Sequence, residues 1–167
     1  HSNYGQSKFK AENILLELSD DQFTVSILRI PMIYGPQAPG NIRSVIKLVN
    51  YLPIIPLGNI NNRRSFISIR NLVYSIDRVL NCRKEGVFLL ADDETISTSS
   101  LVSIIINGIE KNRLLLDSGL IRLLSRLLAP SVYEKLWGNL VINCRVSKES
   151  LSLDFPVDVK AGLADML

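Results

Sequence analysis

Histidine and cysteine are scarce in this sequence, and neither is placed for catalysis or for metal binding. The only histidine of the 167 residues is His1, so nothing supports a histidine-based mechanism. Cys82 and Cys144 are isolated and lack the spacing of metal ligands, so we expect no metal site. A pair of reduced thiols also fits a cytoplasmic protein, which is the location we expect.

Long apolar runs and glycine-rich loops are missing as well. No run is long enough to cross a membrane, and no signal peptide is visible. Neither Gly-x-Gly-x-x-Gly nor Gly-x-x-Gly-x-x-Gly occurs, so these residues lack the usual cradle for a dinucleotide. The net charge of +3 is small and spread out, so we expect no nucleic-acid binding. The hydrophobic content of 47% suits a globular domain with a real core.

The first stretch of the chain predicts a helix that carries a tyrosine and a lysine. Tyr4 and Lys8 are four residues apart, so a helix places both side chains on one face. A phenol gives up its proton more easily beside a fixed positive charge, so this pair is suited to act as a base. The helix should run to about residue 18, with an apolar face formed by Phe9, Ile14, Leu15 and Leu18.

A strand and a loop follow the first helix. The β-branched stretch from Phe23 to Ile30 predicts a buried strand. It leads into Arg29-Ile-Pro-Met-Ile-Tyr-Gly-Pro36, a loop at the carboxyl end of a strand, where ligands of α/β sheets bind. On residue types alone, this stretch is equally a strand-to-turn transition between two prolines.

The middle of the chain offers two more candidate sites at helix starts. Asn41 is a good N-cap for a helix over residues 42–52, where anions are favoured. Arg63 and Arg64 precede an apolar stretch, either as a solvated pair or as a phosphate contact. Asn71 should then cap a helix up to about residue 81.

The stretch from Leu114 to Trp137 is the most apolar part of the chain, and Pro130 should break it into two helices. Its leucines indicate packing in a core or a dimer. The arginines beside them leave open a second interpretation, an interfacial helix that meets a membrane or a lipid-linked substrate. After it, residues 140–143 predict a short strand.

Taken together, these stretches resemble the extended short-chain dehydrogenase/reductases, in particular the NAD-dependent nucleotide-sugar epimerases and dehydratases. Tyr4-Gly-Gln-Ser-Lys8-Phe-Lys-Ala-Glu12 is similar to the active-site helix of that family. The run from Arg29 to Pro36 and the segment from Asn62 to Val73 follow in the family's order. The resemblance reaches the C-terminus, and it implies that a glycine-rich NAD-binding half precedes these residues.

The resemblance implies an α/β fold, namely the C-terminal part of a Rossmann-like parallel sheet with a small helical α/β substrate-binding lobe. Residues 1–91 would end the Rossmann-like catalytic domain, with interleaved substrate-binding segments at about 31–62. Residues 92–167 would form mainly the substrate-binding lobe.

The resemblance also assigns roles to the cofactor side of the site. NAD would be the cofactor. Tyr4 would remove a proton from a sugar hydroxyl, and Lys8 would hold the nicotinamide ribose and favour ionisation of Tyr4. Ile30 and Pro31 would lie near the nicotinamide.

On the substrate side, Met32 would lie near the sugar or the diphosphate, at a position where many epimerases have asparagine. Asn41 would hold the nucleotide sugar, and Arg64 would contact its diphosphate. Asn71 stands where the family usually has aspartate. The Arg63-Arg64-Ser run followed by Asn-Leu resembles a branch that acts in bacterial surface-polysaccharide synthesis.

The function implied is 4-epimerisation of a UDP-hexose or UDP-N-acetylhexosamine through a 4-keto intermediate, by a homodimer. A dehydratase or reductase of the same family is the second interpretation. The third is a non-catalytic fragment that binds only a nucleotide sugar or a partner chain.

Overall fold

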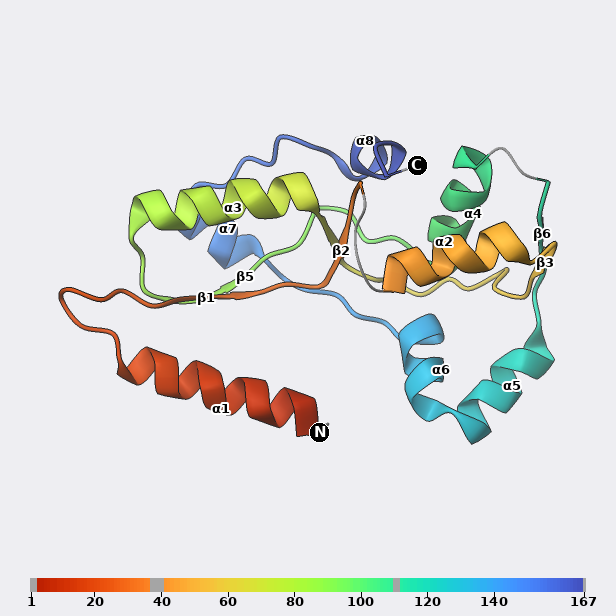
Figure 1. Cartoon of the computed structure of the whole chain (residues 1–167), viewed down its shortest axis with the longest axis horizontal. Helices are drawn as coiled ribbons and strands as arrows, with labels where there is room; N and C mark the ends of the chain where they lie inside the picture. The colour runs from red at the N-terminus through yellow and green to blue at the C-terminus, as the bar shows by residue number, and fades with distance from the viewer. Residues whose placement is uncertain (1–2, 37–40, 110–111, 167) are drawn as a thin grey trace.

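The computed structural model describes residues 3–36, 41–109 and 112–166. Helices alternate with short parallel strands, from α1 (Asn3–Glu17) to α8 (Val159–Ala164), as Figure 1 shows. This order confirms the predicted α/β class, because parallel strands need a crossover segment, usually a helix, between them.

Each strand of the described residues pairs in parallel with one other strand. The pairs are β1 (Ser26–Arg29) with β5 (Gly86–Leu89), β2 (Met32–Tyr34) with β4 (Phe66–Ser68), and β3 (Ile54–Ile55) with β6 (Leu114–Leu115). The predicted strand over 23–30 is therefore shorter than expected, and it is only half-buried. Its burial is incomplete because β5 covers one edge of β1 and no described strand covers the other.

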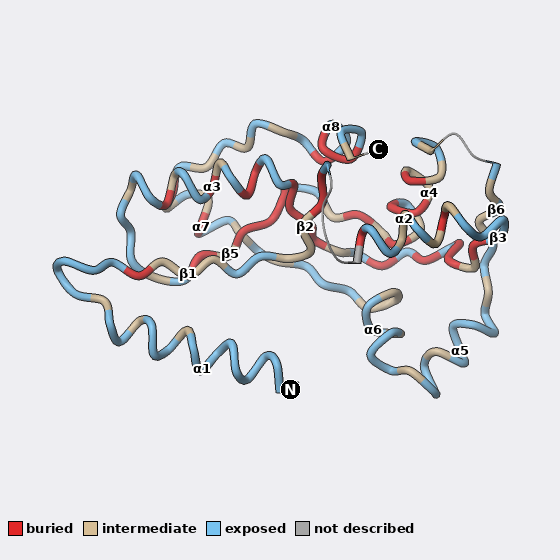
Figure 2. The backbone as a smooth tube through the Cα atoms, in the orientation of Figure 1, coloured by how far each residue is buried: buried red, intermediate tan, exposed pale blue. Residues whose placement is uncertain are grey.

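Two apolar cores lie along the molecule. The remaining helices are α2 (Asn41–Tyr51), α3 (Ile69–Cys82), α4 (Thr98–Gly108), α5 (Gly119–Leu128), α6 (Pro130–Trp137) and α7 (Arg145–Leu151). Residues of β2, β4, α2, α4 and α8 form the first core, and residues of β5, α3 and α7 form the second. Figure 2 shows the buried segments running through the middle of the molecule. The division at residue 91 stays a prediction.

Helix α1 forms as predicted and ends at Glu17, but its apolar face is exposed. None of its residues is buried, and Figure 2 shows α1 along the outside of the molecule. The exposed apolar side chains are Phe9, Ile14 and Leu15, with Leu18 just beyond the helix. Amphipathic spacing therefore predicted the helix correctly, whereas no described element covers its apolar face.

The prediction that Asn71 caps α3 is wrong. The N-cap is Ser68, whose hydroxyl accepts a hydrogen bond from the Asn71 backbone N–H at 3.0 Å. Serine and asparagine are both good N-cap residues. Ser68 is the cap because it stands directly before the first helical residue, about one turn earlier than Asn71. Asn71 is fully buried in the first turn of α3, and its side chain is left for other partners.

The predicted strand over residues 140–143 is also wrong in its extent. Leu140 makes a single bridge with Arg64, through the Ser65 N–H and the Arg63 carbonyl. The Ile142 N–H then donates to the Ser65 hydroxyl at 3.0 Å instead of to a backbone carbonyl. A side chain thus ends the backbone ladder after one residue.

A buried polar network around Asp92 connects the elements that the cores bring together. The Asp92 carboxylate accepts hydrogen bonds from the Tyr34 hydroxyl at 2.6 Å, the Asn71 amide at 2.8 Å and the Ser68 N–H at 3.1 Å. Burial raises the pKa of Asp92 against the opposing effect of these donors, and burial beside Asp92 also raises the pKa of Tyr34. Asn71 further bonds the backbone of Val157 through both of its amide atoms.

Replacement of Asn71 with aspartate should destabilise the fold by about 3 kcal/mol at pH 7. The new carboxylate would lie against Asp92 and could not donate the two bonds of the amide. One of the two carboxyls must then hold a proton, with a pKa that is raised in the folded state. A raised folded-state pKa favours folding at acidic pH, so the loss of stability should grow as pH rises from about 4 to 7. Urea unfolding at several pH values measures the free energy of unfolding of the variant and of the unmodified protein.

The control is Asn61→Asp, because Asn61 is exposed. It should change the free energy of unfolding by no more than about 0.5 kcal/mol. Equal losses in the two variants, or a loss for Asn71→Asp that does not depend on pH, would contradict the network as described.

Candidate functional site

Tyr4 and Lys8 lie next to each other on α1, as their spacing predicts. The Lys8 ammonium lies over the Tyr4 ring, 5.7 Å from the ring centroid. Tyr4 is 73% exposed and Lys8 is exposed too, so both side chains are open to a ligand. A cation this close to a phenol ring is held by the ring quadrupole and keeps a positive charge near the hydroxyl.

An ion pair ties α1 to the carboxyl end of β1. The Arg29 Nε donates to the Glu12 carboxylate at 3.0 Å, and this bond lowers the pKa of Glu12 and raises the pKa of Arg29. Ile30 and Pro31 come directly after Arg29, so they stand where the α1 helix is attached. Ile30 is exposed and Pro31 is half-buried. The structure therefore brings Ile30 and Pro31 to the carboxyl end of a parallel strand, the usual place for ligands.

Met32 and Tyr34 belong to β2, and they face different environments. Met32 is half-buried and packs against the first core, whereas Tyr34 is fully buried and reaches Asp92. Gly35 follows with a φ of 144°, and a Cβ there would lie 2.6 Å from the Ile69 side chain. Only glycine fits a turn with this φ and this close approach to α3.

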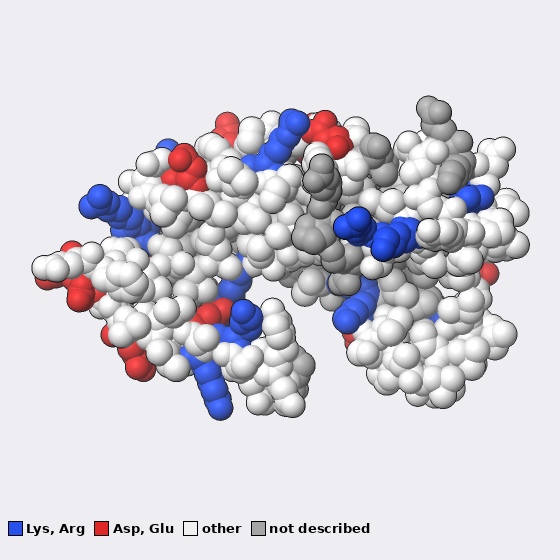
Figure 3. Space-filling view, in the orientation of Figure 1, with Lys and Arg blue, Asp and Glu red and all other residues white. Residues whose placement is uncertain are grey.

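An open notch separates α1 from the lobe formed by α5 and α6, as Figure 3 shows. The first residues of α1, which include Tyr4, border the notch, and α6 lies across from them in Figure 1. Helix α2 begins at Asn41 above the notch in the same view. The Asn41 side chain and residues 37–40 lie outside the described residues, so the expected N-cap is not described.

Arg64 lies on the opposite side of the notch from α1, against the end of α6. Its Nη1 donates to the carbonyls of Gly138 at 2.9 Å and Glu134 at 3.2 Å. Burial lowers the pKa of Arg64 from its usual value. The last carbonyls of a helix have no partner within the helix and carry partial negative charge, so a guanidinium is well placed there. Arg63, in contrast, is exposed.

Asn62 completes the attachment of α6. Its amide nitrogen donates to the carbonyls of Gly138 at 2.9 Å and Leu136 at 3.1 Å, and its oxygen accepts from the Thr98 N–H. Beside it, a polar cavity of about 450 Å³ is lined by Asn59, Ile60, Asn61, Asn62, Arg122, Trp137 and Asn139. The segment before β4 therefore both holds α6 and lines a cavity, which local spacing does not reveal.

A second cavity, of about 370 Å³, lies at the carboxyl end of β5. Arg63, Asp93, Lys148 and Glu149 are among the charged residues that line it, and Lys148 pairs with Asp93. Of these residues, sequence reasoning singled out only Arg63, and it missed Asp93, Lys148 and Glu149. The position of Asp93 soon after a parallel strand could have identified this cavity, because ligand sites of α/β proteins lie at the carboxyl ends of strands.

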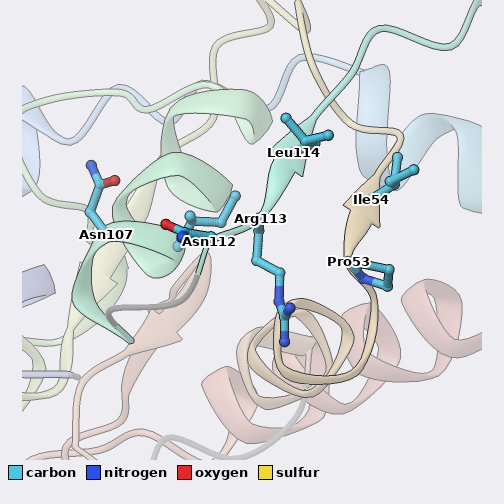
Figure 4. Close-up of a pocket in the computed structure, with 7 residues that line it drawn as sticks. Pro53, Ile54, Asn107, Asn112, Arg113 and Leu114 are labelled. Carbon is cyan, nitrogen blue, oxygen red and sulfur yellow. The ribbon is translucent and has the colours of Figure 1, made fainter.

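A third cavity contains none of the predicted site residues. Its volume is about 920 Å³, and it lies beside β3 and β6. Figure 4 shows Arg113 reaching from this cavity toward the end of α2. Arg113 donates to the carbonyls of Val49 and Asn50, both at 2.9 Å, so its role is to cap α2.

The described residues contain neither a cluster of metal ligands nor a helix that could span a membrane. Within the three described ranges, no three histidine, cysteine, aspartate or glutamate side chains gather where they would hold a metal ion. Among the helices of those ranges, none combines the length and the apolar character needed to cross a bilayer.

The parallel strands with helices between them define a Rossmann-like α/β protein. The chain belongs to the NAD dependent epimerase/dehydratase family, whose model matches residues 1–91.

One curated relative and two solved structures describe the similarity. The UDP-glucose 4-epimerase of Vibrio cholerae is 31% identical over an alignment of 167 positions, which covers 96% of this chain and 51% of that protein. The chain therefore spans about half the length of the curated relative that it matches. The dTDP-glucose 4,6-dehydratase of Bacillus anthracis, in complex with NAD, shares the fold with a TM-score of 0.72 at 20% identity, over 99% of this chain and 51% of that one. The enzyme WbmF of Bordetella bronchiseptica, in complex with NAD+ and UDP, has a TM-score of 0.69 at 18% identity, over 99% and 52% of the two chains.

Replacement of Arg64 with alanine should lower the free energy of unfolding by about 2 kcal/mol, because bonds from a charged donor to two carbonyls are lost. The neighbouring Arg63→Ala is the matched control, since Arg63 is exposed, and it should change stability by less than about 0.5 kcal/mol. Urea unfolding of both variants measures the difference. If Arg64→Ala is as stable as the unmodified protein, Arg64 does not hold α6.

Proposed function

We propose that the chain is the catalytic and substrate-binding part of an NAD-dependent 4-epimerase of nucleotide sugars. A UDP-linked hexose or N-acetylhexosamine is the substrate class, and surface-polysaccharide synthesis is the role. The family match and the 31% identity to a UDP-glucose 4-epimerase support this proposal.

The observation that carries the proposal is the exposed Tyr4–Lys8 pair on a helix joined to the carboxyl end of β1. A proton acceptor must be open to the substrate, and Tyr4 meets this need because it is 73% exposed, with the Lys8 ammonium 5.7 Å from its ring centroid. The Glu12–Arg29 ion pair fixes the helix beside Ile30 and Pro31.

The residues of this chain fit the nicotinamide end of NAD. Tyr4 and Lys8 offer a hydroxyl and an ammonium to a ribose, and Ile30 and Pro31 offer apolar surface to a flat ring. When bound, NAD supplies the acceptance and return of a hydride. The chain's own residues orient the sugar and move its proton.

Tyr4 is the proposed acid and base. Its phenolate accepts the proton of the sugar 4-hydroxyl as the C4–H bond breaks, and the sugar becomes a 4-ketone. The ketone then turns over, and the same phenol returns the proton to the 4-oxygen when hydrogen comes back to the opposite face of C4. Lys8, whose ammonium lies over the Tyr4 ring, is proposed to hold the nicotinamide ribose.

Three residues are proposed to hold the substrate. Arg64 contacts the diphosphate, and a guanidinium has five N–H donors, so the two carbonyls on Nη1 leave others for phosphate. Asn41 stands at the start of α2, where a helix favours anions. Met32, at the beginning of β2, would provide apolar contact for the sugar.

We further propose that the protein forms a homodimer in the cytoplasm. The exposed apolar side of α1 supports a dimer, because Phe9 and Ile14 would otherwise face water. The two free cysteines support a reducing compartment. Sedimentation equilibrium should give twice the mass of one chain, and the mass of a single chain at micromolar concentration would contradict the dimer.

The activity is tested with the full-length gene product that contains this chain. With NAD, it should interconvert UDP-glucose and UDP-galactose or their N-acetylamino forms, which NMR of the reaction mixture distinguishes. A 4-keto-6-deoxy product would instead identify a dehydratase. Binding of UDP-sugars without any conversion would favour a non-catalytic binding role.

The variant Tyr4→Phe should lower kcat by about 10²-fold to 10⁴-fold, because it removes the group that moves the proton. Its affinity for NAD should change little, since the ring and Lys8 remain. Tyr51→Phe is the matched control, because Tyr51 is an equally exposed tyrosine on α2, and it should leave kcat unchanged. Loss of NAD binding in Tyr4→Phe, or unchanged turnover, would show that Tyr4 has a structural role.

A further inference from the structure

Helix α5 presents a wide apolar face that no other described element covers. Successive residues of a helix are about 100° apart, so its six apolar side chains fall within an arc of about 160°. These are Leu120, Ile121, Leu123, Leu124, Leu127 and Leu128, and all six are exposed. Its main neighbour is α6, and Figure 1 shows both helices at one end of the molecule.

The opposite arc of α5 is basic. It carries Arg122, Ser125 and Arg126, both arginines are exposed, and the helix contains no acidic residue. Helix α1, the other exposed amphipathic helix, differs because its polar positions include the acidic Glu12 and Glu17 as well as lysines. Figure 3 shows the face of the α5–α6 lobe turned to the viewer as largely free of charged side chains.

Size and charge decide which partner fits this face. A stable protein interface buries about 800 Å² on each partner, and one face of a ten-residue helix about 15 Å long offers less. A second copy of the chain would also bring the same arginines close to one another. An anionic lipid surface has no such limit, because it takes up apolar side chains of any number and attracts both arginines.

We propose that α5 lies on the surface of an anionic phospholipid bilayer. The leucines enter the boundary between headgroups and acyl chains, and the arginines stay at the level of the phosphates. Arg122 also lines the polar cavity beside Asn62 and Trp137, so the bilayer would lie next to one wall of that cavity. This inference does not depend on the chemistry proposed for Tyr4.

The test is co-sedimentation of the purified chain with vesicles of phosphatidylcholine alone or mixed with phosphatidylglycerol. The chain should bind the mixed vesicles at least about tenfold more tightly, and salt should weaken the binding. Leu127→Glu with Leu128→Glu should reduce the affinity by about tenfold or more. These side chains are 68% and 80% exposed, so their replacement leaves the cores intact, which circular dichroism checks.

The matched control is Leu80→Glu on α3, where the leucine is 69% exposed, and its affinity should stay within about twofold of the unmodified chain. A second variant, Arg122→Glu with Arg126→Glu, leaves every leucine in place and should lose about tenfold on the mixed vesicles. No binding to the mixed vesicles, or equal binding by the α5 variants, overturns the proposal. The proposal is also overturned if the chain does not bind vesicles and the leucine variant is a monomer where the unmodified chain is a dimer. That result would mean that the apolar face of α5 contacts a second copy of the chain.

Discussion

The buried carboxylate of Asp92 is the constraint on which the arrangement of the strands depends. A buried carboxylate costs several kcal/mol unless donors surround it, and here the donors come from β2, β4 and α3. Those three elements must be in place together before the charge is satisfied. The network therefore couples the first core to the second, since Tyr34 belongs to one and the elements around Asn71 to the other.

The same network also constrains β2 and the segment that leads into α8. Tyr34 has to reach Asp92 from β2, and Gly162 of α8 lies so close that a Cβ would be 2.9 Å from the Tyr34 hydroxyl. Asn71 fixes the segment before α8 by bonding Val157. An aspartate at position 71 could not donate to Asp92, which gives a physical reason for the departure from the family pattern at this position.

Sequence patterns predicted correctly the features that depend on neighbouring residues. They failed where the role of a residue depends on a partner far away in the sequence. Periodicity and Pro130 were sufficient for α1 and for the break between α5 and α6, because both depend on neighbours in the sequence. The spacing of Tyr4 and Lys8 likewise placed them on one face. Asn71 was assigned to a cap because capping is a local preference, whereas its true partners lie 21 and 86 residues away. The roles of the predicted site residues stay predictions, because they concern a ligand.

Arg64 illustrates how a residue of a binding motif can also belong to the fold. Its bonds to Glu134 and Gly138, with those of Asn62 to Leu136 and Gly138, attach α6 to the body of the molecule. Helix α5 is joined to the body at its start through β6, which pairs with β3, and at its end through α6. The carbonyl contacts of Arg64 and Asn62 therefore contribute to the position of its apolar face. A diphosphate bound to the remaining N–H donors of Arg64 would leave the bonds from Nη1 to the Glu134 and Gly138 carbonyls intact. The structural role and the proposed binding role of this guanidinium are therefore compatible, because they use different N–H groups of one rigid, planar side chain.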